Sequence, residues 1–293
     1  MAIIIDGKKT AEEMRKEFAS RISAVKAKGH VPGLAVVLVG EDPASEVYVR
    51  MKGKACEELG MHSETIKLPA DCSEKTLMDV IDRLNTDDKI DGILVQHPIP
   101  CVKDESGVFN RINPAKDVDC FNAINVGRLV IGDGYLFPCT PAGCIELLKR
   151  YKIDTKGKHA VVVGRSNIVG KPVANLLMQK IEGGNCTTTV VHTATKDIAS
   201  FTKQADILVV AAGRPDYIKG DMIKDGAVVI DVGINRVADA SKKSGFRLVG
   251  DCEYATCEKK ASAITPVPGG VGPMTITMLM HNTILSAEKR VGI

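Results

Sequence analysis

Few aromatic residues and no block of basic residues occur in this chain of 293 residues. Phenylalanine, tyrosine and tryptophan together make up 4% of the sequence, and the formal net charge is only +3. A nucleic-acid groove usually needs clustered lysines and arginines with aromatic rings among them. The composition therefore argues against nucleic acid as a partner and leaves small anionic ligands open.

The sequence also lacks an apolar segment long enough for a secretion signal or a membrane span, since the apolar run near the N-terminus has four residues. Nine cysteines are present, but no C-x-x-C pair occurs and the histidines show no zinc-ligand spacing. We therefore expect a cytoplasmic protein with reduced, mostly buried thiols and no bound metal.

Apolar runs alternate with helical patterns along almost the whole chain, which is typical of α/β proteins with parallel strands. We expect strands near residues 34–40, 64–68, 92–96, 160–163, 187–191, 206–211 and 227–231, and a short edge strand at 247–251. The pattern predicts two α/β domains around a cleft. The first is expected at residues 1–145, with a final helix at 274–293 packing back on it, and the second at 146–273 as a Rossmann-like dinucleotide-binding domain.

The stretch GKHAVVVGRSNIVGKP at residues 157–172 is the most informative segment. It reads as a buried strand, a turn with Gly164 and Gly170, and a helix opened by Pro172. Such a turn presents backbone N–H groups to a phosphate, and Arg165 and Ser166 can add hydrogen bonds to the same anion. The spacing is not G-x-G-x-x-G, so an ordinary turn remains the alternative.

The end of the next strand bears on the choice of dinucleotide. An acidic residue there binds the adenosine ribose of NAD, but this strand runs into His192 and Thr193 without an acid. Arg165 and Thr193 suit the 2′-phosphate of NADP instead. The alternative is that Arg165 caps a helix or faces solvent.

Candidate catalytic groups lie in the first half of the chain. Tyr48 and Lys52 are four residues apart on a predicted helix, and Gln96 closes the apolar strand GILVQ, where side chains reach a ligand crevice. A solvent-facing pair and a loop-bonded glutamine are the ordinary alternatives. Short-chain dehydrogenases also carry a Tyr–Lys pair, but downstream of their glycine turn, so the chain order here excludes that class.

Two further segments offer ligand groups. Asp117 and Asp119 follow a proline turn, where carboxylates more often cap or close turns than bind ligands. The loop ITPVPGGVGPMT at 264–275 lets backbone approach a flat ligand at Gly269 and Gly270, with a structural hinge as the alternative.

Several motifs in order resemble the bifunctional methylenetetrahydrofolate dehydrogenase/methenyltetrahydrofolate cyclohydrolase family. They are IIDGK, PASEVYVRMKGKACEELG, DGILVQHPIP, KDVD, PCTPAG, GRSNIVGKP, VVIDVGIN and PGGVGPMTITML, and they span nearly the whole chain. The resemblance implies two α/β domains around a cleft, a homodimer, and NADP-dependent oxidation of methylenetetrahydrofolate followed by hydrolysis to the formyl product.

By this resemblance, each site residue also receives a role. The catalytic residues are Lys52, Tyr48 and Gln96; the folate is bound by Tyr48, Asp119, Pro268, Gly269, Gly270 and Val271; and NADP is bound by Gly164, Arg165, Ser166, Ile168, Thr193, Gly233 and Ile234.

Three positions depart from the family pattern. His97 stands where the family usually has leucine, Cys120 where it has glycine, and Asn122 where it commonly has histidine. They adjoin Gln96 and Asp119, so they bear on pocket shape and relative rates. A dehydrogenase without the cyclohydrolase step, using NAD or NADP, and a non-catalytic nucleotide-binding protein on the same fold stay open as alternatives.

Overall fold

The computed structural model describes residues 2–242 and 245–293 and divides into two compact units. The three-stranded unit comprises Glu13–Cys139 and Ile276–Ile293, and the six-stranded unit comprises the chain up to Glu12 and Thr140–Thr275. Both units are built of helices and parallel strands, which confirms the expected α/β class. The first residues join the six-stranded unit because they add a strand to its sheet. The first part of the three-stranded unit therefore runs from Glu13 to Cys139, whereas the sequence pattern predicts a first domain at residues 1–145.

The three-stranded unit has one parallel sheet in the order β3-β2-β4. Its strands are β2 (Gly33–Val39), β3 (His62–Leu68) and β4 (Gly92–Val95), and its helices are α2 (Pro43–Leu59), α3 (Glu74–Thr86), α4 (Glu105–Arg111), α5 (Ala123–Ile131), most of α1 (Gly7–Ala27) and most of α10 (Val271–Val291). The central strand β2 is buried along its whole length, as its unbroken apolar run predicts.

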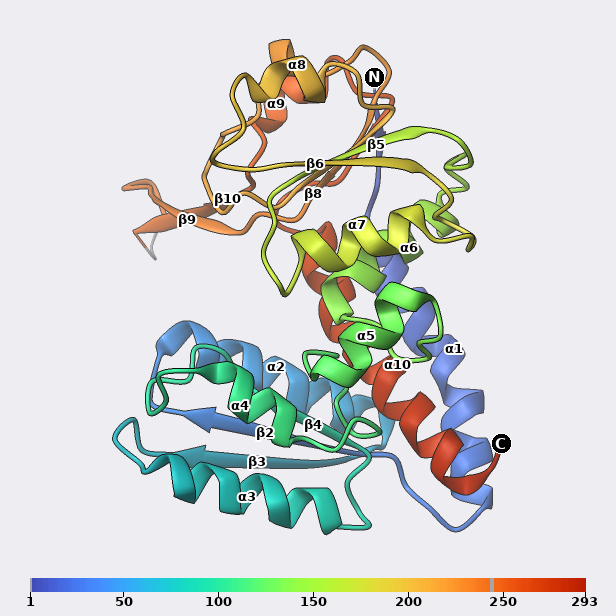
Figure 1. Cartoon of the computed structure of the whole chain (residues 1–293), viewed down its shortest axis with the longest axis vertical. Helices are drawn as coiled ribbons and strands as arrows, with labels where there is room; N and C mark the ends of the chain where they lie inside the picture. Colours follow the sequence, from blue (N-terminus) through green and yellow to red (C-terminus); the bar gives the residue numbers. More distant parts are fainter. Residues whose placement is uncertain (1, 243–244) are drawn as a thin grey trace. The chain divides into compact units, whose positions relative to one another are not determined.

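Helices cover both faces of this small sheet, and Figure 1 shows α2 and α3 on opposite sides of it. One face of β2 packs against α3 and α4, with Val37 in a cluster that includes Leu77, Ile81 and Val108. Leu77 and Ile81 are one helical turn apart, so the apolar stripe of α3 faces the sheet. The carboxyl ends of β2 and β4 are thereby fixed.

The six-stranded unit has a parallel sheet in the order β1-β11-β8-β7-β5-β6. Its strands are β1 (Ile3–Ile4), β5 (His159–Val163), β6 (Thr187–Val191), β7 (Ile207–Val210), β8 (Val228–Asp231) and β11 (Ala263–Ile264), and its helices are α6 (Cys139–Arg150), α7 (Gly170–Met178), α8 (Ile198–Thr202), the 3-10 turn η1 (Gly220–Met222) and α9 (Tyr254–Cys257). Figure 1 shows α7 on one face of the sheet and α8 with α9 on the other.

The expectation of a short edge strand of the main sheet at residues 247–251 is wrong. β10 (Phe246–Val249) does not extend the main sheet; it pairs antiparallel with β9 (Asn235–Ala238) in a separate two-stranded sheet. The alternating exposure of both strands suits a hairpin with one solvated face better than a buried parallel strand.

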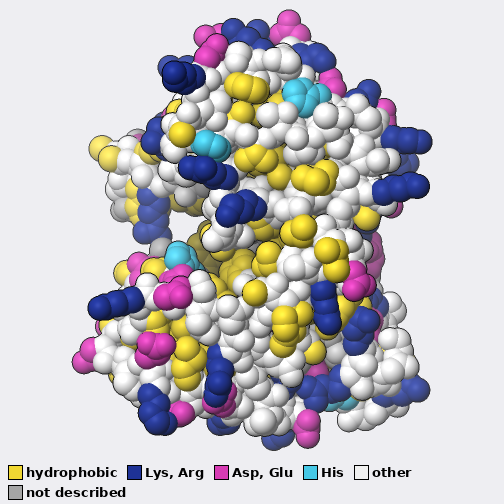
Figure 2. All heavy atoms as spheres, viewed as in Figure 1, with side chains coloured by type: hydrophobic (Ala, Val, Ile, Leu, Met, Phe, Trp, Pro, Cys, Tyr) yellow, Lys and Arg dark blue, Asp and Glu magenta, His cyan; other side chains and the backbone are white. Residues whose placement is uncertain are grey.

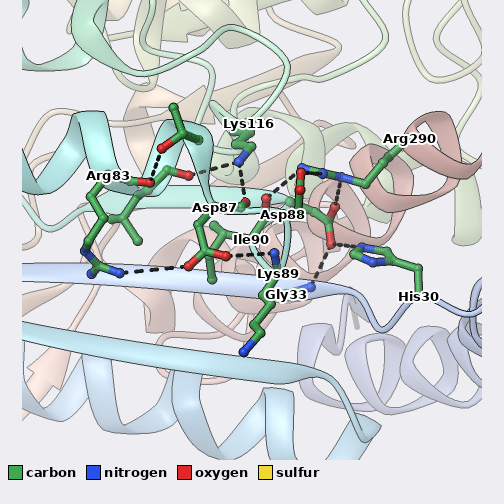
Figure 3. Close-up of polar contacts among 12 residues, drawn as sticks. His30, Gly33, Arg83, Asp87, Asp88, Lys89, Ile90, Lys116 and Arg290 are labelled. Atoms are coloured by element: carbon green, nitrogen blue, oxygen red, sulfur yellow. Dashed lines mark hydrogen bonds and ion pairs between the residues drawn. The ribbon is translucent and has the colours of Figure 1, made fainter.

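A buried ionic network ties the last helix to the three-stranded unit. Asp91 is 1% exposed and hydrogen-bonds the backbone N–H of Gly33 at 2.9 Å and His30 Nε2 at 2.8 Å, and it pairs with Arg290 Nε of α10 at 2.7 Å. Nearby, the Lys116 ammonium donates to two backbone carbonyls at the end of α3 (Figure 3). These contacts hold the segment that leads into Asp119.

Charged side chains are mixed on the molecular surface. On the face drawn in Figure 2, lysines and arginines are interspersed with aspartates and glutamates over each unit. In the described part of the chain, no helix is both long enough and apolar enough to cross a membrane.

Candidate active site

Helix α2 carries two of the predicted catalytic side chains. It begins cleanly because the Asp42 carboxylate accepts a hydrogen bond from Ser45 N at 2.8 Å and Pro43 occupies the first turn. Tyr48 and Lys52 follow one turn apart. Tyr48 is 38% exposed, whereas Lys52 is only 8% exposed, so the lysine amine points into protein and the phenol stays accessible.

The amine of Lys52 is fixed by Gln96, which directly follows β4. Gln96 N donates to Val37 O at 2.8 Å, so the backbone continues the sheet for one more residue. Its side-chain oxygen then accepts from Lys52 Nζ at 2.8 Å, and its amide nitrogen donates to the His97 carbonyl at 2.9 Å. The amide of Gln96 is therefore oriented with its oxygen toward the lysine.

Lys52 and Asp119 influence each other's charge. Burial lowers the pKa of Lys52, and the negative charge of Asp119 opposes that shift. Burial raises the pKa of Asp119, and the positive charge of Lys52 opposes it. Each group is thus moved toward its neutral form. A neutral amine at Lys52 is able to accept a proton.

The segment around Asp119 is rigidly held. Ile93 N donates to Lys116 O at 2.7 Å and pairs with Asp117 in an isolated parallel bridge to β4. The buried Asp117 carboxylate accepts from Asn122 N at 2.9 Å and Asn125 Nδ2 at 2.8 Å, and burial raises the pKa of Asp117 to about 6. Asp117 is therefore a structural anchor for its neighbour Asp119.

Two cysteines border the same segment. The Cys139 thiol donates to Val118 O at 3.3 Å, and burial together with the nearby charge of Asp119 raises its pKa well above the ordinary value, so the thiol is neutral. No local pattern in the sequence indicates that Cys139 lies near Asp119. Cys120 has φ of 58°, a conformation that favours glycine and costs a side chain about 1 kcal/mol. This explains why glycine suits that position in the family pattern.

The glycine turn of the six-stranded unit lies where β5 ends. Gly164 has φ of 124°, and a Cβ there would lie 2.2 Å from Ala211 O, so only glycine fits. The Ser166 hydroxyl accepts from Val169 N at 3.1 Å and Gly170 N at 3.2 Å at the start of α7. Ser166 thus acts as a cap in the structure, while Arg165 next to it is exposed.

The end of β6 lies beside this turn, because β5 and β6 are parallel neighbours and Val163 pairs with Val191. The residues that follow form a tight turn, in which Thr195 N donates to His192 O at 2.8 Å and the exposed Thr193 stands at the corner. Arg165 and Thr193 therefore follow adjacent strands at one edge of the sheet. A glycine turn, an exposed cation and a strand end without an acid fit a phosphorylated dinucleotide.

The remaining predicted residues lie farther along the same edge. Ile234, directly before β9, is 45% exposed, and a Cβ on Gly272 would lie 3.4 Å from its Cδ1. The loop at 268–271 is held by a hydrogen bond from Lys8 N to Gly269 O at 3.0 Å. This loop and Ile234 are thus neighbours within the six-stranded unit. Ile168, in the glycine turn, is 41% exposed.

The nine cysteines are free thiols, most of them buried. Within residues 2–242 and 245–293, no three histidine, cysteine or carboxylate side chains gather into a metal-binding group.

Two domain models of one family match the chain. The catalytic domain of tetrahydrofolate dehydrogenase/cyclohydrolase matches residues 5–119, and the NAD(P)-binding domain of the same family matches residues 138–291. The bifunctional protein FolD of Chlorobium chlorochromatii is 59% identical over 290 residues, which cover 98% of both chains.

Solved structures agree with these matches. The bifunctional FolD of Campylobacter jejuni has a TM-score of 0.93 at 45% identity, covering 99% of this chain and 100% of that one. The methylenetetrahydrofolate dehydrogenase-cyclohydrolase of Trypanosoma brucei, solved with NADP and an inhibitor, has a TM-score of 0.92 at 41% identity, covering 99% and 98%. The resemblance found in the sequence is confirmed: this chain belongs to the tetrahydrofolate dehydrogenase/cyclohydrolase family.

Proposed function

We propose that this chain oxidises 5,10-methylenetetrahydrofolate with NADP to 5,10-methenyltetrahydrofolate and then hydrolyses that product to 10-formyltetrahydrofolate. The observation that carries the proposal is the buried amine of Lys52, held on Gln96 and influenced by Asp119, in a chain that matches both domain models of the family. The three-stranded unit supplies Tyr48, Lys52, Gln96 and Asp119 to the folate, and the six-stranded unit binds NADP.

The oxidation step places few chemical demands on the protein. The hydride leaves the methylene carbon with its electron pair, and the folate nitrogens stabilise the resulting cation by resonance. No proton leaves that carbon, so no base is needed. NADP supplies the hydride acceptor, and the side chains contribute by aligning the two reactants.

The hydrolysis step needs a base, and Lys52 is the proposed one. A water molecule adds to the methenyl carbon and transfers a proton to the neutral amine, after which the ring opens to the formyl product. Gln96 keeps the amine in place through its 2.8 Å hydrogen bond, and Tyr48 positions the reacting ring. The cationic substrate itself further lowers the Lys52 pKa, because like charges disfavour the ammonium form.

The other site residues take binding roles in this proposal. Asp119 anchors the amino group of the pterin, and Pro268, Gly269, Gly270 and Val271 border the folate. NADP is held by Gly164, Arg165, Ser166, Ile168, Thr193, Gly233 and Ile234. The exposed Arg165 and the missing acid after β6 support a preference for NADP over NAD.

We expect Arg165→Ala to weaken catalysis with NADP more than with NAD. A charge-assisted hydrogen bond to a phosphate contributes about 1.5–3 kcal/mol, so kcat/KM with NADP should fall about 10- to 100-fold. Steady-state kinetics with both dinucleotides measure the change. Arg247→Ala, which removes an exposed arginine from β10, is the matched control and should leave both values unchanged. A wild-type enzyme as efficient with NAD as with NADP would contradict the preference.

A coupled assay tests the two-step reaction. Supplied methylenetetrahydrofolate should reduce NADP while the methenyl absorbance rises and then decays. Permanent accumulation of methenyltetrahydrofolate would instead identify a dehydrogenase without the cyclohydrolase step. Absence of any nucleotide reduction would favour a non-catalytic protein.

We also expect a homodimer formed through the six-stranded unit. Family resemblance suggests it, and β6 supports it, because it is an edge strand whose side chains are mostly exposed or half-buried. Sedimentation at micromolar concentration should give twice the chain mass of 31.3 kDa. A species of single-chain mass would contradict the assignment.

The remaining expectations concern partners and location. The small net charge of +3 and the scarcity of aromatic residues support small anionic ligands rather than nucleic acid as partners. Free thiols support a cytoplasmic location, where such groups stay reduced.

A further inference from the structure

Two buried aspartates lie under the edge of the six-stranded sheet that carries the proposed cofactor residues. Asp231 is the last residue of β8 and is 3% exposed, and Asp251, just beyond β10, has no exposed surface. Neither belongs to the site residues discussed above. Buried carboxylates need several hydrogen bonds to offset the loss of water, so their partners reveal what they hold in place.

Asp251 binds the loop that follows β7. Its Oδ2 accepts from Ala212 N at 2.6 Å and from Gly213 N at 2.8 Å, and its Oδ1 accepts from Arg214 N at 3.0 Å. Three consecutive backbone N–H groups thus converge on one carboxylate. The same Oδ1 accepts from Asn235 Nδ2 at 2.8 Å, which ties in the start of β9.

The same carboxylate also lies against the loop that follows β8. A Cβ on Gly233 would be 2.2 Å from Asp251 Oδ1, so the Gly233 backbone rests directly on the carboxylate. Asp231 completes this support, because it accepts from Gly233 N and from Asp251 N, each at 3.0 Å. The two aspartates therefore interlock the loops after β7, β8 and β10.

The loop after β7 also lies against the glycine turn that follows β5. Ala211, directly before the pinned residues, has its carbonyl oxygen 2.2 Å from the position of a Cβ on Gly164. A shift of the loop after β7 would therefore be felt by the glycine turn after β5. Asp251 therefore contacts Gly233 directly and is linked to Gly164 through the loop that begins at Ala211.

From these contacts we infer that Asp251 is a positioning residue for the nicotinamide dinucleotide: it sets the loops after β7 and β8 in the shape that receives the cofactor. The inference rests on the proposed function. It assigns cofactor affinity to a carboxylate that acts through Gly233 and through residues 212–214, without contact to the cofactor being required. If Asp251 only stabilised the fold, its replacement would instead reduce NADP binding and cofactor-free hydrolysis to the same extent.

The test is Asp251→Asn, which keeps the side-chain shape but turns one acceptor oxygen into a donor facing N–H groups. We expect the Kd of NADP, measured by calorimetry, and the KM of NADP to rise about 10-fold or more. The reason is that buried backbone N–H groups of residues 212–214 lose their acceptor. The KM of methylenetetrahydrofolate and the hydrolysis of supplied methenyltetrahydrofolate without cofactor should stay within about twofold of wild type, because Lys52, Gln96 and Asp119 belong to the three-stranded unit.

Asp206→Asn is the matched control. Asp206 lies just before β7, at the opposite end of the same strand, where it binds His159 N at 2.9 Å and Lys224 Nζ at 2.6 Å. This variant should bind NADP as wild type does. An unchanged Kd in Asp251→Asn, or an equal loss of NADP binding and of cofactor-free hydrolysis, would overturn the inference.

Asn235→Ala is the second test variant, to be used if Asp251→Asn does not fold. It removes a single donor from the Asp251 carboxylate and should raise the Kd of NADP by about threefold or more, whereas an unchanged Kd overturns the inference. A wild-type protein that does not bind NADP would overturn the proposed function and this inference with it. If the wild type binds NADP and Asp251→Asn binds it with the same Kd, this inference alone is overturned.

Discussion

Replacing Lys52 with methionine should lower the hydrolysis of methenyltetrahydrofolate by about 100-fold or more, the usual scale for removing a general base. Methionine preserves the length and apolar stem of the side chain but cannot accept a proton. Oxidation of methylenetetrahydrofolate should fall less, because hydride transfer needs alignment and no base. Measured separately, the rate of methenyltetrahydrofolate hydrolysis should therefore fall more than the rate of methylenetetrahydrofolate oxidation. In the coupled reaction, methenyltetrahydrofolate should accumulate.

Lys54→Met is the matched control on the same helix. The Lys54 side chain is 74% exposed and its Nζ lies 3.7 Å from Glu58 Oε1, so its loss should leave both rates nearly unchanged. Wild-type hydrolysis of methenyltetrahydrofolate by Lys52→Met would show that Lys52 is not the base.

The pH profile gives a second signature for Lys52. The base acts as the neutral amine, so the hydrolysis rate should rise with pH and level off above the Lys52 pKa. Burial places that pKa below the ordinary lysine value of 10.5, so the rise should come at lower pH than for an exposed lysine. Lys52→Met should lose this rise, whereas Lys54→Met should retain it.

Most of the central strands could be predicted because each is a continuous apolar run. The expected strand at 34–40 is β2, Gly33–Val39, and the expected strand at 206–211 is β7, Ile207–Val210. The pairing of β1 with β11 could not be predicted, because each has two residues and they come from opposite ends of the chain. A run that short carries no periodicity.

The candidate site was accessible from sequence only in part. Helical spacing placed Tyr48 and Lys52 on one face, and the strand end placed Gln96 at the sheet edge, but the 2.8 Å contact between Lys52 and Gln96 depends on how α2 packs on the sheet. The contact of Cys139 with Asp119 and the role of Asp251 left no local pattern at all. Such groups become visible only when distant segments are brought together.

Asp119 is the group whose loss should most impair folate binding. Removing a buried charged partner costs about 2–4 kcal/mol, so Asp119→Ala should raise the Kd of the folate by about 30-fold or more. The Kd of NADP should not change, because the cofactor residues belong to the six-stranded unit. Calorimetric titration with each ligand measures both values. Asp133→Ala, which removes an exposed aspartate of the same unit, is the control.

Asp119→Ala should also shift the pH profile of hydrolysis. The carboxylate opposes the lowering of the Lys52 pKa, so its removal leaves burial unopposed by that charge and the pKa falls further. The rise of the hydrolysis rate should then occur at lower pH than in the wild type, when measured at saturating folate. Normal folate affinity in Asp119→Ala would exclude Asp119 as the pterin anchor, and an unmoved pH profile would show that its charge does not act on Lys52.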